Sequence, residues 1–574
     1  MKLLPQPEAL RQSRLGWADL LVILAVLTLL GLIAHVGSEA MVSFQPPDVS
    51  PVVSLDPRNL PEYAARSSLR MFIALGCSTA FTLIYGSLAA HNRRAEKVLI
   101  PLLDILQSVP VLGFLSITVT GFIALFPGSL LGLEAASIFA IFTSQVWNMT
   151  FSFYQSLRTV PQELTEAASL YGLSRWQRFS RLELPSAAIP LLWNAMMSFG
   201  GGWFFLAASE AISVLNQSYT LPGIGSYVAA AVAARNLGAL GWAVLAMAVV
   251  ILLLDQLFWR PLVAWSNRFR LEQSGGGDAP SSWVFNLLRT ARVPTLVGEA
   301  LAPVHERLDH LLSALLGPVS EGSSEAETPG ADRMFNLAAM LAVGVLLAAL
   351  VHFILTTVGM AEVVSAFWMG LHTLARVVLL LAAATVIWTP IGVAIGFQPR
   401  LARLLQPLVQ FLASFPANFI FPFATLFFIH SHVPIGWGSI LLMALGSQWY
   451  ILFNSIAGAQ TIPSDLREMA DDVGLRGLQR WRKLIIPGIF SAWVTGGVTA
   501  SGGAWNASIV SEVVSWGGTT LKADGLGAYI AEATNQGDWP RIALGIGLMS
   551  LFVVGLNRVF WRRLYGLAER RYHL

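Results

Sequence analysis

The sequence of 574 residues has few groups that could cross-link it or let it perform chemistry alone. It contains one cysteine, Cys77, which excludes an intrachain disulfide and a cysteine-based metal cluster. None of its four lysines follows a glycine, so no phosphate-binding P-loop is present. No Ser/His/Asp or His-Glu-x-x-His constellation stands out. The chain is therefore predicted not to be an enzyme by itself and to bind no metal.

Charge is also scarce. Charged residues make up 12% of the chain, about half the usual share, whereas 55% of the residues are hydrophobic. The mean hydropathy is +0.63. The net charge of +3 gives no sign of nucleic-acid binding, because the basic residues lie in the segments between apolar runs. These features predict an all-α polytopic membrane protein.

About twelve apolar runs reach the roughly 18–20 residues that a membrane-spanning helix needs. The first run could pass for a signal peptide, but it is long and no small-x-small cleavage site follows, so we interpret it as a retained anchor. The expected spans cover residues 17–36, 67–90, 104–126, 134–156, 188–214, 238–260, 334–356, 371–396, 408–430, 436–457, 489–514 and 541–560.

Basic segments alternate with loops that are poor in Arg and Lys, which places both termini and all the basic loops on the cytoplasmic side. Six spans in each half is an even number. The two halves should therefore share one orientation and be related by an axis along the membrane normal, as parallel repeats are.

The strongest signal is an internal repeat. Residues 166–185 read EAASLYGLSRWQRFSRLELP, and residues 468–487 read EMADDVGLRGLQRWRKLIIP. The same offset of 302 positions pairs Trp203 with Trp505 and Glu210 with Glu512. Both polar copies lie between long apolar runs, so we expect them to contact something outside the membrane.

These patterns divide the chain into four parts. Residues 1–66 form an N-terminal anchor and a proline-rich extracytoplasmic segment over 37–66. Residues 67–270 and 334–574 form two membrane domains, with polar loops at 161–185 and 463–487. The linker 271–333 is flexible at both ends by composition and contains one or two short amphipathic helices. It is a tether or, alternatively, a regulatory element.

Each polar loop predicts a helix, a turn and a second helix. Pro161 begins the first helix, and Gly172 ends it in the left-handed conformation. Ser174 caps the second helix. The second copy repeats this plan with Pro463, Gly474 and Pro487.

This pattern resembles the EAA loop of permease subunits of binding-protein-dependent ABC importers with a type I architecture. In that family the loop is a coupling helix that docks on an ATP-binding subunit; the alternative is a solvated loop without a partner. Met469 departs from the family, which usually has alanine there. The resemblance assigns coupling to Glu166, Ala167, Ala168, Gly172, Glu468, Ala470 and Gly474.

The resemblance implies two ATP-binding subunits, as a homodimer, which carry the ATP and magnesium, so this chain itself binds no cofactor. It also implies an extracytoplasmic solute-binding protein and a place in the bacterial cytoplasmic (inner) membrane. The Trp-to-Glu spacing followed by Gly223–Gly225 and Gly525–Gly527 resembles the nitrate, sulfonate, taurine and bicarbonate branch.

Ionisable groups inside spans are costly and usually functional. Glu210 and Glu512 either line a cavity between the halves or accept hydrogen bonds from unwound backbone. Arg70 and Arg376 are expected to be membrane-interface anchors or helix-end partners, and the alternative is that they are ligands of the solute. The second half is the more polar at this depth, and we predict that it makes more of the solute contacts. The expected pathway residues are Trp203, Glu210, Trp505, Asn506, Ser508 and Glu512.

Two functions compete at this point. The first is the permease of an ATP-driven importer for a small polar anion or zwitterion, and the alternative is an ion-coupled secondary transporter, which places carboxylates at mid-membrane. Two glutamates facing a cavity repel a bare anion unless they are protonated or paired, which favours a zwitterion over nitrate.

Overall fold

The computed structural model describes residues 16–40, 53–108, 111–113, 115–214, 217–269, 282–317 and 329–571. The first half and the linker contain α1 (Trp17–Ala40), α2 (Leu60–His91), α3 (Arg93–Ser108), α4 (Leu115–Leu125), α5 (Leu131–Arg158), α6 (Gln162–Leu170), α7 (Arg175–Arg178), α8 (Leu184–Glu210), β1 (Ala211–Val214), β2 (Gln217–Thr220), α9 (Ile224–Ala233), α10 (Leu237–Leu254), α11 (Arg260–Ser266), α12 (Trp283–Thr290) and α13 (Val293–Leu316). The second half contains α14 (Pro329–Thr357), α15 (Met360–Gly396), α16 (Pro399–Ser414), α17 (Phe421–His430), α18 (Ile435–Thr461), α19 (Ser464–Asp472), α20 (Gly477–Arg480), α21 (Ile486–Ser511), β3 (Val513–Trp516), β4 (Thr519–Lys522), α22 (Leu526–Gln536), α23 (Trp539–Leu556) and α24 (Arg562–Arg571).

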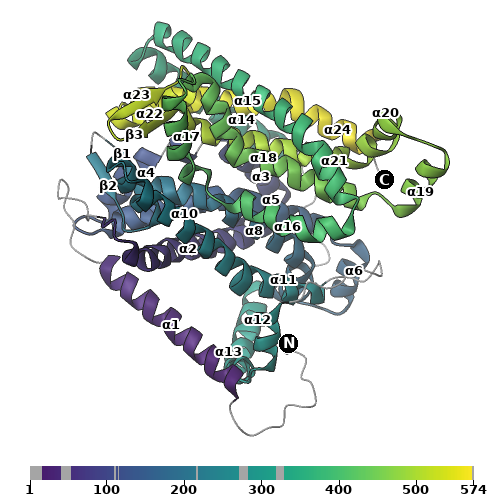
Figure 1. Ribbon diagram of the computed structural model, residues 1–574. Coiled ribbons are helices and arrows are strands. Elements are labelled where there is room, and N and C mark those ends of the chain that lie inside the picture. Colours follow the sequence, from purple (N-terminus) through teal and green to yellow (C-terminus); the bar gives the residue numbers. More distant parts are fainter. Residues whose placement is uncertain are drawn as a thin grey trace.

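The two halves form two helical bundles that lie side by side (Figure 1). From α2 and α15 onward, both halves contain the same elements in the same order. The short helices α6, α19 and α20 lie together at one end of the molecule, and the strands lie at the opposite end (Figure 1). This arrangement confirms two parallel repeats in an all-α polytopic protein.

All twelve expected spans fall on helices, but two of them are broken. Residues 104–126 and 408–430 are each divided between two helices, α3 and α4 or α16 and α17. In the second case Phe415 precedes Pro416 and is extended, at φ −74° and ψ 127°. A residue before proline is driven out of the helical region, so the helix ends there.

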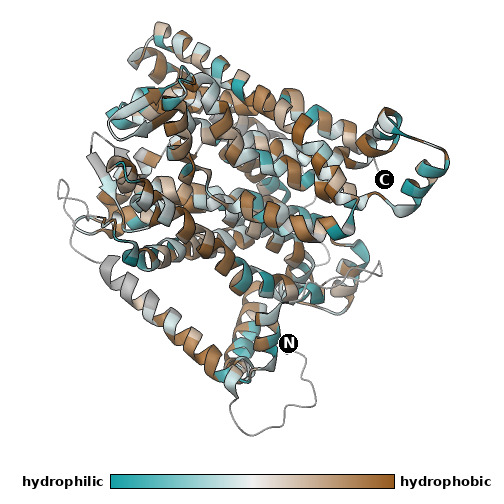
Figure 2. Cartoon of the chain, in the orientation of Figure 1, coloured by the Kyte–Doolittle hydropathy of each residue, from teal (hydrophilic) through white to brown (hydrophobic). Residues whose placement is uncertain are grey.

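Among the described residues, seven helices are long and apolar enough to cross a membrane by themselves. They belong to α2, α8, α10, α15, α18, α21 and α23. The total of twelve spans remains a prediction. Figure 2 shows mainly hydrophobic residues along the long helices and hydrophilic residues at α6, α19 and α20.

The broken helices join the halves. α3 packs against α23 of the second half, and α16 packs against α8 and α10 of the first. The backbone N–H of Val111, between α3 and α4, donates to Asn506 Oδ1 at 3.1 Å. Asn418, between α16 and α17, donates through Nδ2 to the Phe204 carbonyl oxygen at 3.1 Å. The broken helix of each half therefore packs against the other half.

Two antiparallel hairpins are present that the sequence did not predict. β1 pairs with β2 from Ala211↔Thr220 to Val214↔Gln217, and β3 pairs with β4 from Val513↔Lys522 to Trp516↔Thr519. The expected spans 188–214 and 489–514 are therefore too long at their C-terminal ends. The helices end at Glu210 and Ser511, and strands follow.

The helix ends also differ from two boundaries that the sequence analysis expected. The segment 37–66 is not extended throughout, because α1 continues to Ala40 and α2 begins at Leu60. α14 begins at Pro329, so the boundary at 333 falls inside a helix. The expected linker helices are confirmed as α12 and α13. Residues 41–52, 270–281 and 318–328 lie outside the described part of the chain.

Candidate functional site

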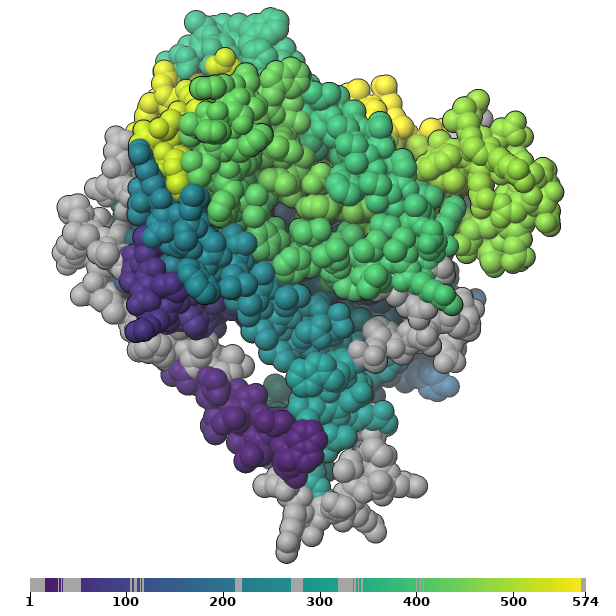
Figure 3. All heavy atoms as spheres, viewed as in Figure 1, coloured from purple at the N-terminus to yellow at the C-terminus, as the bar shows by residue number. Residues whose placement is uncertain are grey.

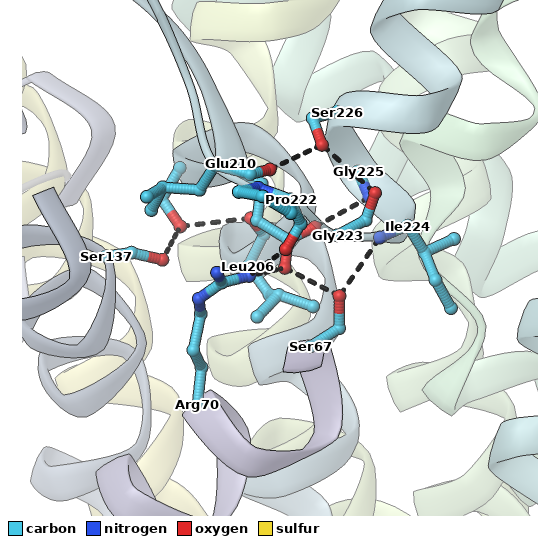
Figure 4. Close-up of polar contacts among 12 residues, drawn as sticks. Ser67, Arg70, Ser137, Leu206, Glu210, Pro222, Gly223, Ile224, Gly225 and Ser226 are labelled. Carbon is cyan, nitrogen blue, oxygen red and sulfur yellow. Dashed lines mark hydrogen bonds and ion pairs between the residues drawn. The ribbon is translucent and has the colours of Figure 1, made fainter. Parts of the chain in front are cut away.

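A buried carboxylate holds together the end of α8 in the first half (Figure 4). Glu210 is the last residue of α8 and is 0% exposed. Its Oε1 accepts hydrogen bonds from Ser67 Oγ and Arg70 Nη1, each at 2.6 Å. Its Oε2 accepts the backbone N–H of Gly225 at 2.7 Å. Glu210 thereby joins α2, α8 and α9 in one network.

The guanidinium of Arg70 is shared between two carboxylates. Besides Glu210, it contacts Glu134 on α5 through Nε at 2.5 Å and Nη2 at 2.6 Å. Arg70 Nη1 also donates to the carbonyl oxygen of Pro222 at 3.0 Å. Arg70 is 2% exposed, so this cation is enclosed by its partners. A bidentate Arg–carboxylate pair fixes orientation as well as charge.

Two glycines allow the loop before α9 to lie against the carboxylate. A Cβ atom on Gly223 would lie 2.3 Å from the Glu210 carboxyl carbon. A Cβ on Gly225 would lie 2.6 Å from the Ala207 Cα in α8. The Gly-x-Gly element therefore serves close approach of backbone to the buried charge.

The second half repeats this network. Glu512 Oε1 accepts from Thr373 Oγ1 and Arg376 Nη1, each at 2.8 Å, and its Oε2 accepts from Ala528 N at 3.1 Å. Glu512 is also 0% exposed. Gly436 stands at the position equivalent to Glu134, near Arg376 Nη2. Arg376 therefore lacks the second carboxylate in this network and is the more exposed arginine, at 13% of its side chain against 3% for Arg70.

This geometry bears on the two interpretations of the glutamates. Both oxygens of Glu210 and of Glu512 accept hydrogen bonds, including one from backbone at the start of a short helix, so it favours a structural role. Arg70 and Arg376 are helix-to-helix partners and not membrane-interface anchors. Glu512 is paired with Arg376, and Glu210 shares Arg70 with Glu134, so both glutamates contact a cation, which weakens the electrostatic objection to an anionic solute.

The remaining expected pathway residues are mostly buried inside the halves. Trp203 and Trp505 are 2% and 1% exposed, and Ser508 donates to the Trp505 carbonyl oxygen at 2.7 Å. Asn506 is the one that is partly exposed, and its amide bonds to Val111 across the boundary between the halves. Asn506 therefore lies on the seam between the halves.

The hairpin end of this seam is closed by contacts between the halves. The N–H of Gly517, in the β3–β4 turn, donates to the carbonyl oxygen of Val232 in α9 at 3.3 Å. The Arg235 side chain lies over Gly517, where an added Cβ would lie 2.8 Å from Arg235 Cγ. On the other side α22 contacts β1. Each hairpin thus covers the short helix of the opposite half.

The polar loops lie at the other end and have the predicted local structure. Gly172 and Gly474 are left-handed, at φ +64° and +72°. The N–H of Leu173 donates to the Ala168 carbonyl oxygen at 3.1 Å, and that of Leu475 to the Ala470 carbonyl oxygen at 2.8 Å. These bonds are the helix-ending pattern typical of glycine. In the first loop Ser174 and Gln177 form a capping box on α7.

The expected coupling residues divide into an exposed and a buried set. Glu166 and Glu468 are exposed, whereas Ala168 and Ala470 are 6% and 1% exposed and pack within their own chain. Their small size therefore has an internal packing reason. The exposed apolar side chains of the loops are Leu164, Leu170, Tyr171, Met469, Val473 and Leu478.

Three residues of the buried networks escaped the sequence analysis. They are Ser67, Glu134 and Thr373. Ser67 and Thr373 are separated by the same offset as Arg70 and Arg376, which could have revealed them. Glu134 has no acidic mate, so the repeat gives no signal for it. Within the described residues, no three His, Cys, Asp or Glu side chains are placed to hold a metal ion.

Comparison with known proteins gives a family match in both halves. The model of the binding-protein-dependent transport system inner membrane component matches residues 82–258 and 388–573. These two matches cover most of both bundles, including both polar loops and both buried glutamates.

Individual relatives match about a third of the chain. The bicarbonate transport system permease protein CmpB of Synechocystis sp. is 29% identical over 31% of this chain and 61% of its own length. The nitrate import permease protein NrtB of Leptolyngbya laminosa is 27% identical over 33% of this chain and 65% of its own. The trimethylamine N-oxide transport system permease protein TmoV of Pelagibacter ubique is 25% identical over 34% and 25%, respectively. The chain thus spans less than two thirds of the length of these relatives.

The network makes a prediction about stability. Replacing Gly225 with alanine should lower the melting temperature of the purified protein, because the new methyl group would overlap the α8 backbone and push Glu210 from its partners. The matched control is Gly76→Ala on α2, where no atom lies within 4 Å of the added Cβ. We expect a loss of about 1–3 kcal/mol for Gly225→Ala and none for Gly76→Ala. Equal melting temperatures for the two variants would contradict this packing.

Proposed function

The chain belongs to the family of binding-protein-dependent transport system inner membrane components, and from that premise we propose that it is the membrane-spanning part of an ATP-driven importer. In this proposal both permease domains lie in one chain in the bacterial cytoplasmic membrane, with both termini in the cytoplasm. Two identical ATP-binding subunits carry the ATP and magnesium. An extracytoplasmic binding protein delivers the solute.

The pair of loops at one end of the molecule carries this proposal. Each loop presents one exposed helix, α6 or α19, that ends at a left-handed glycine. Leu170 and Tyr171 are each 84% exposed, and Val473 is 71% exposed. Exposed apolar residues beside exposed glutamates on a polar loop are typical of a docking surface. Two equivalent surfaces suit the two subunits of a dimeric motor.

Each loop is connected rigidly to the buried network at the opposite end. The helix that begins at Arg175 continues through a π-helical turn into α8 and ends at Glu210, 36 residues in all. The second half contains the same continuous helix from Gly477 to Ser511. At 1.5 Å per residue the first of these is about 54 Å long. A displacement of either loop is thereby transmitted through the whole membrane to the hairpins.

The solute path follows the seam between α8 and α21 in this proposal. Gly201 of α8 faces the hydroxyl of Tyr450 on α18, and Gly503 of α21 lies near the same tyrosine ring. Asn506 lies just under one turn beyond Gly503, toward the hairpins. Val232 and Gly517 are in contact at the hairpin end, so the halves are closed there in this structure. In this proposal the hairpin end is the one that opens to admit solute. Rocking of the two long helices then exposes the seam to one side at a time.

We propose a small anion, of the size of nitrate or bicarbonate, as the solute. The names of two relatives point to these ions, and each of the two glutamates is paired with an arginine, Arg70 or Arg376. The same pairing weakens the case for an ion-coupled secondary transporter. Such a protein needs a carboxylate that can release and bind a proton or cation, and both Glu210 and Glu512 are held by arginine.

Docking is tested by placing charge on the loops. Tyr171→Asp together with Val473→Asp should abolish copurification of the ATP-binding subunits and solute-stimulated ATP hydrolysis. The melting temperature of the isolated permease should stay unchanged, because both side chains are exposed. Tyr171→Phe is the control that keeps the apolar area. A double variant that still binds the motor and hydrolyses ATP would contradict the docking role.

Function itself is tested in the same preparation. Proteoliposomes that contain the wild-type assembly should take up labelled nitrate or bicarbonate when ATP is supplied on the loop side, and uptake should survive collapse of proton and sodium gradients. The aspartate variant should be inactive. Uptake that follows an ion gradient and ignores ATP would support the secondary transporter instead.

The contact between the halves at the hairpin end gives a further prediction. With Cys77 replaced by serine, Arg235→Cys and Gly517→Cys should form a disulfide, because Arg235 Cγ lies 2.8 Å from the position of an added Cβ on Gly517. The cross-link should stop uptake, and a reducing agent should restore it. Each single-cysteine variant serves as a control. Full uptake in completely cross-linked protein would show that solute does not pass between α9 and the β3–β4 hairpin.

A further inference from the structure

The linker helix α13 presents an apolar stripe that no part of the described chain covers. Its members recur at intervals of four and three residues, which places them on one narrow face of the helix. Each of them is exposed by half or more. The stripe consists of Val297, Leu301, Val304, Leu308, Leu311 and Leu315.

The other faces of α13 are polar and either face solvent or contact the first polar loop. Glu299 and Glu306 project on the side opposite the stripe by helical spacing, and both are exposed. Asp309 lies between these two faces and contacts the first polar loop. The helix is therefore amphipathic, and its contact with the bundle leaves the apolar face free.

The first end of α13 is fixed to α1. Asp19, in the first turn of α1, accepts the backbone N–H groups of Arg292 at 2.5 Å and Val293 at 2.8 Å. A carboxylate at this position satisfies the open donors of a helix start. α1 is the first expected span, and most of the exposed side chains described on it are apolar, Leu20, Leu24 and Leu27 among them. The start of α13 is thereby placed where α1 enters the membrane.

The second end of α13 is fixed at the base of the first polar loop. Asp309 accepts Trp176 Nε1 at 2.8 Å and Arg181 Nη2 at 3.1 Å. The carbonyl oxygen of Gly317, just after the helix, accepts the N–H of Arg175 at 3.1 Å. Arg175 begins the helix that runs directly into α8. This second anchor therefore also lies where a membrane span begins.

A helix held between two such points lies along the membrane boundary. With 24 residues, α13 is about 36 Å long. Trp17 and Trp283 are exposed beside its first end, at 71% and 60%, and tryptophan favours the membrane–water interface. Figure 3 shows α1 and the linker helices projecting together from the side of the bundles.

We propose that α13 is an interfacial helix whose apolar stripe lies in the lipid of the leaflet on the polar-loop side. The stripe continues the apolar surface that α1 offers to lipid, and the carboxylates opposite it face water. α13 has three acidic residues and a single arginine, so the binding comes from apolar burial and not from attraction to anionic lipid. The helix then braces α7 of the first loop against the membrane surface. This inference requires a membrane-embedded chain but not a particular solute or motor.

Spin labels at single cysteines test this placement. In a Cys77→Ser background, nitroxides at Val304→Cys and Leu308→Cys report on the stripe, and Glu306→Cys reports on the opposite face. Val386→Cys on α15, which is 73% exposed within a span, serves as the lipid standard. All four sites are exposed, so the label displaces no core atom. The full chain, with any copurified subunits, is reconstituted in phosphatidylcholine vesicles.

Accessibility to oxygen and to a water-soluble nickel chelate then gives the position of each label. The stripe labels should show an oxygen-to-nickel ratio several-fold above that of Glu306→Cys, at a depth of about 5–10 Å below the headgroups. Stripe labels that the nickel chelate reaches freely would overturn the proposal, because the stripe would face water. Labels shielded from both reagents would overturn it too, since a protein partner or a second copy would then cover the stripe.

Discussion

The fold depends on a charge that is buried at the end of one long helix in each half, α8 or α21. Glu210 and Glu512 lie where helix gives way to hairpin, and each is held by an arginine from the helix that begins its half. Breaking such a buried pair costs about 3–5 kcal/mol, because the remaining charge has no partner. The pairs therefore fix α8 against α2 and α21 against α15. The hairpins follow directly after α8 and α21, so this contact also sets their position.

The same two helices connect the two ends of the molecule. One continuous helix per half joins a polar loop to a buried ion pair, and the broken helices α3–α4 and α16–α17 cross to the opposite bundle. Each half therefore packs a broken helix against the core of the other. Two long helices coupled through shared packing have a small number of stable arrangements, and the proposed alternating access needs such arrangements. The halves are not equivalent, however. Glu134 gives Arg70 a second carboxylate, and α13 supports only the first loop.

Much of this architecture was predictable from the sequence because it is repeated. The offset between Glu166 and Glu468 revealed two parallel halves, and Gly172 and Ser174 gave the turn and cap of the first loop. The hairpins were missed because apolar residues resume directly after the Ser-Glu pair at each helix end, so the apolar run continues past the end of the helix. The pairing of Glu210 with Arg70 was missed because a contact between residues 140 positions apart leaves no local pattern. Glu134, which has no counterpart in the second half, could be found only in three dimensions.

A double-mutant cycle at the simpler of the two networks tests the central claim that the buried pair is a scaffold and does not bind solute. Arg376→Met and Glu512→Met are each expected to lower the melting temperature strongly, and the double variant should recover much of the loss, because no unpaired charge remains. The solute concentration for half-maximal uptake should be unchanged in the double variant. A stable double variant with greatly weakened solute dependence would contradict the account and place Glu512 in the transport path.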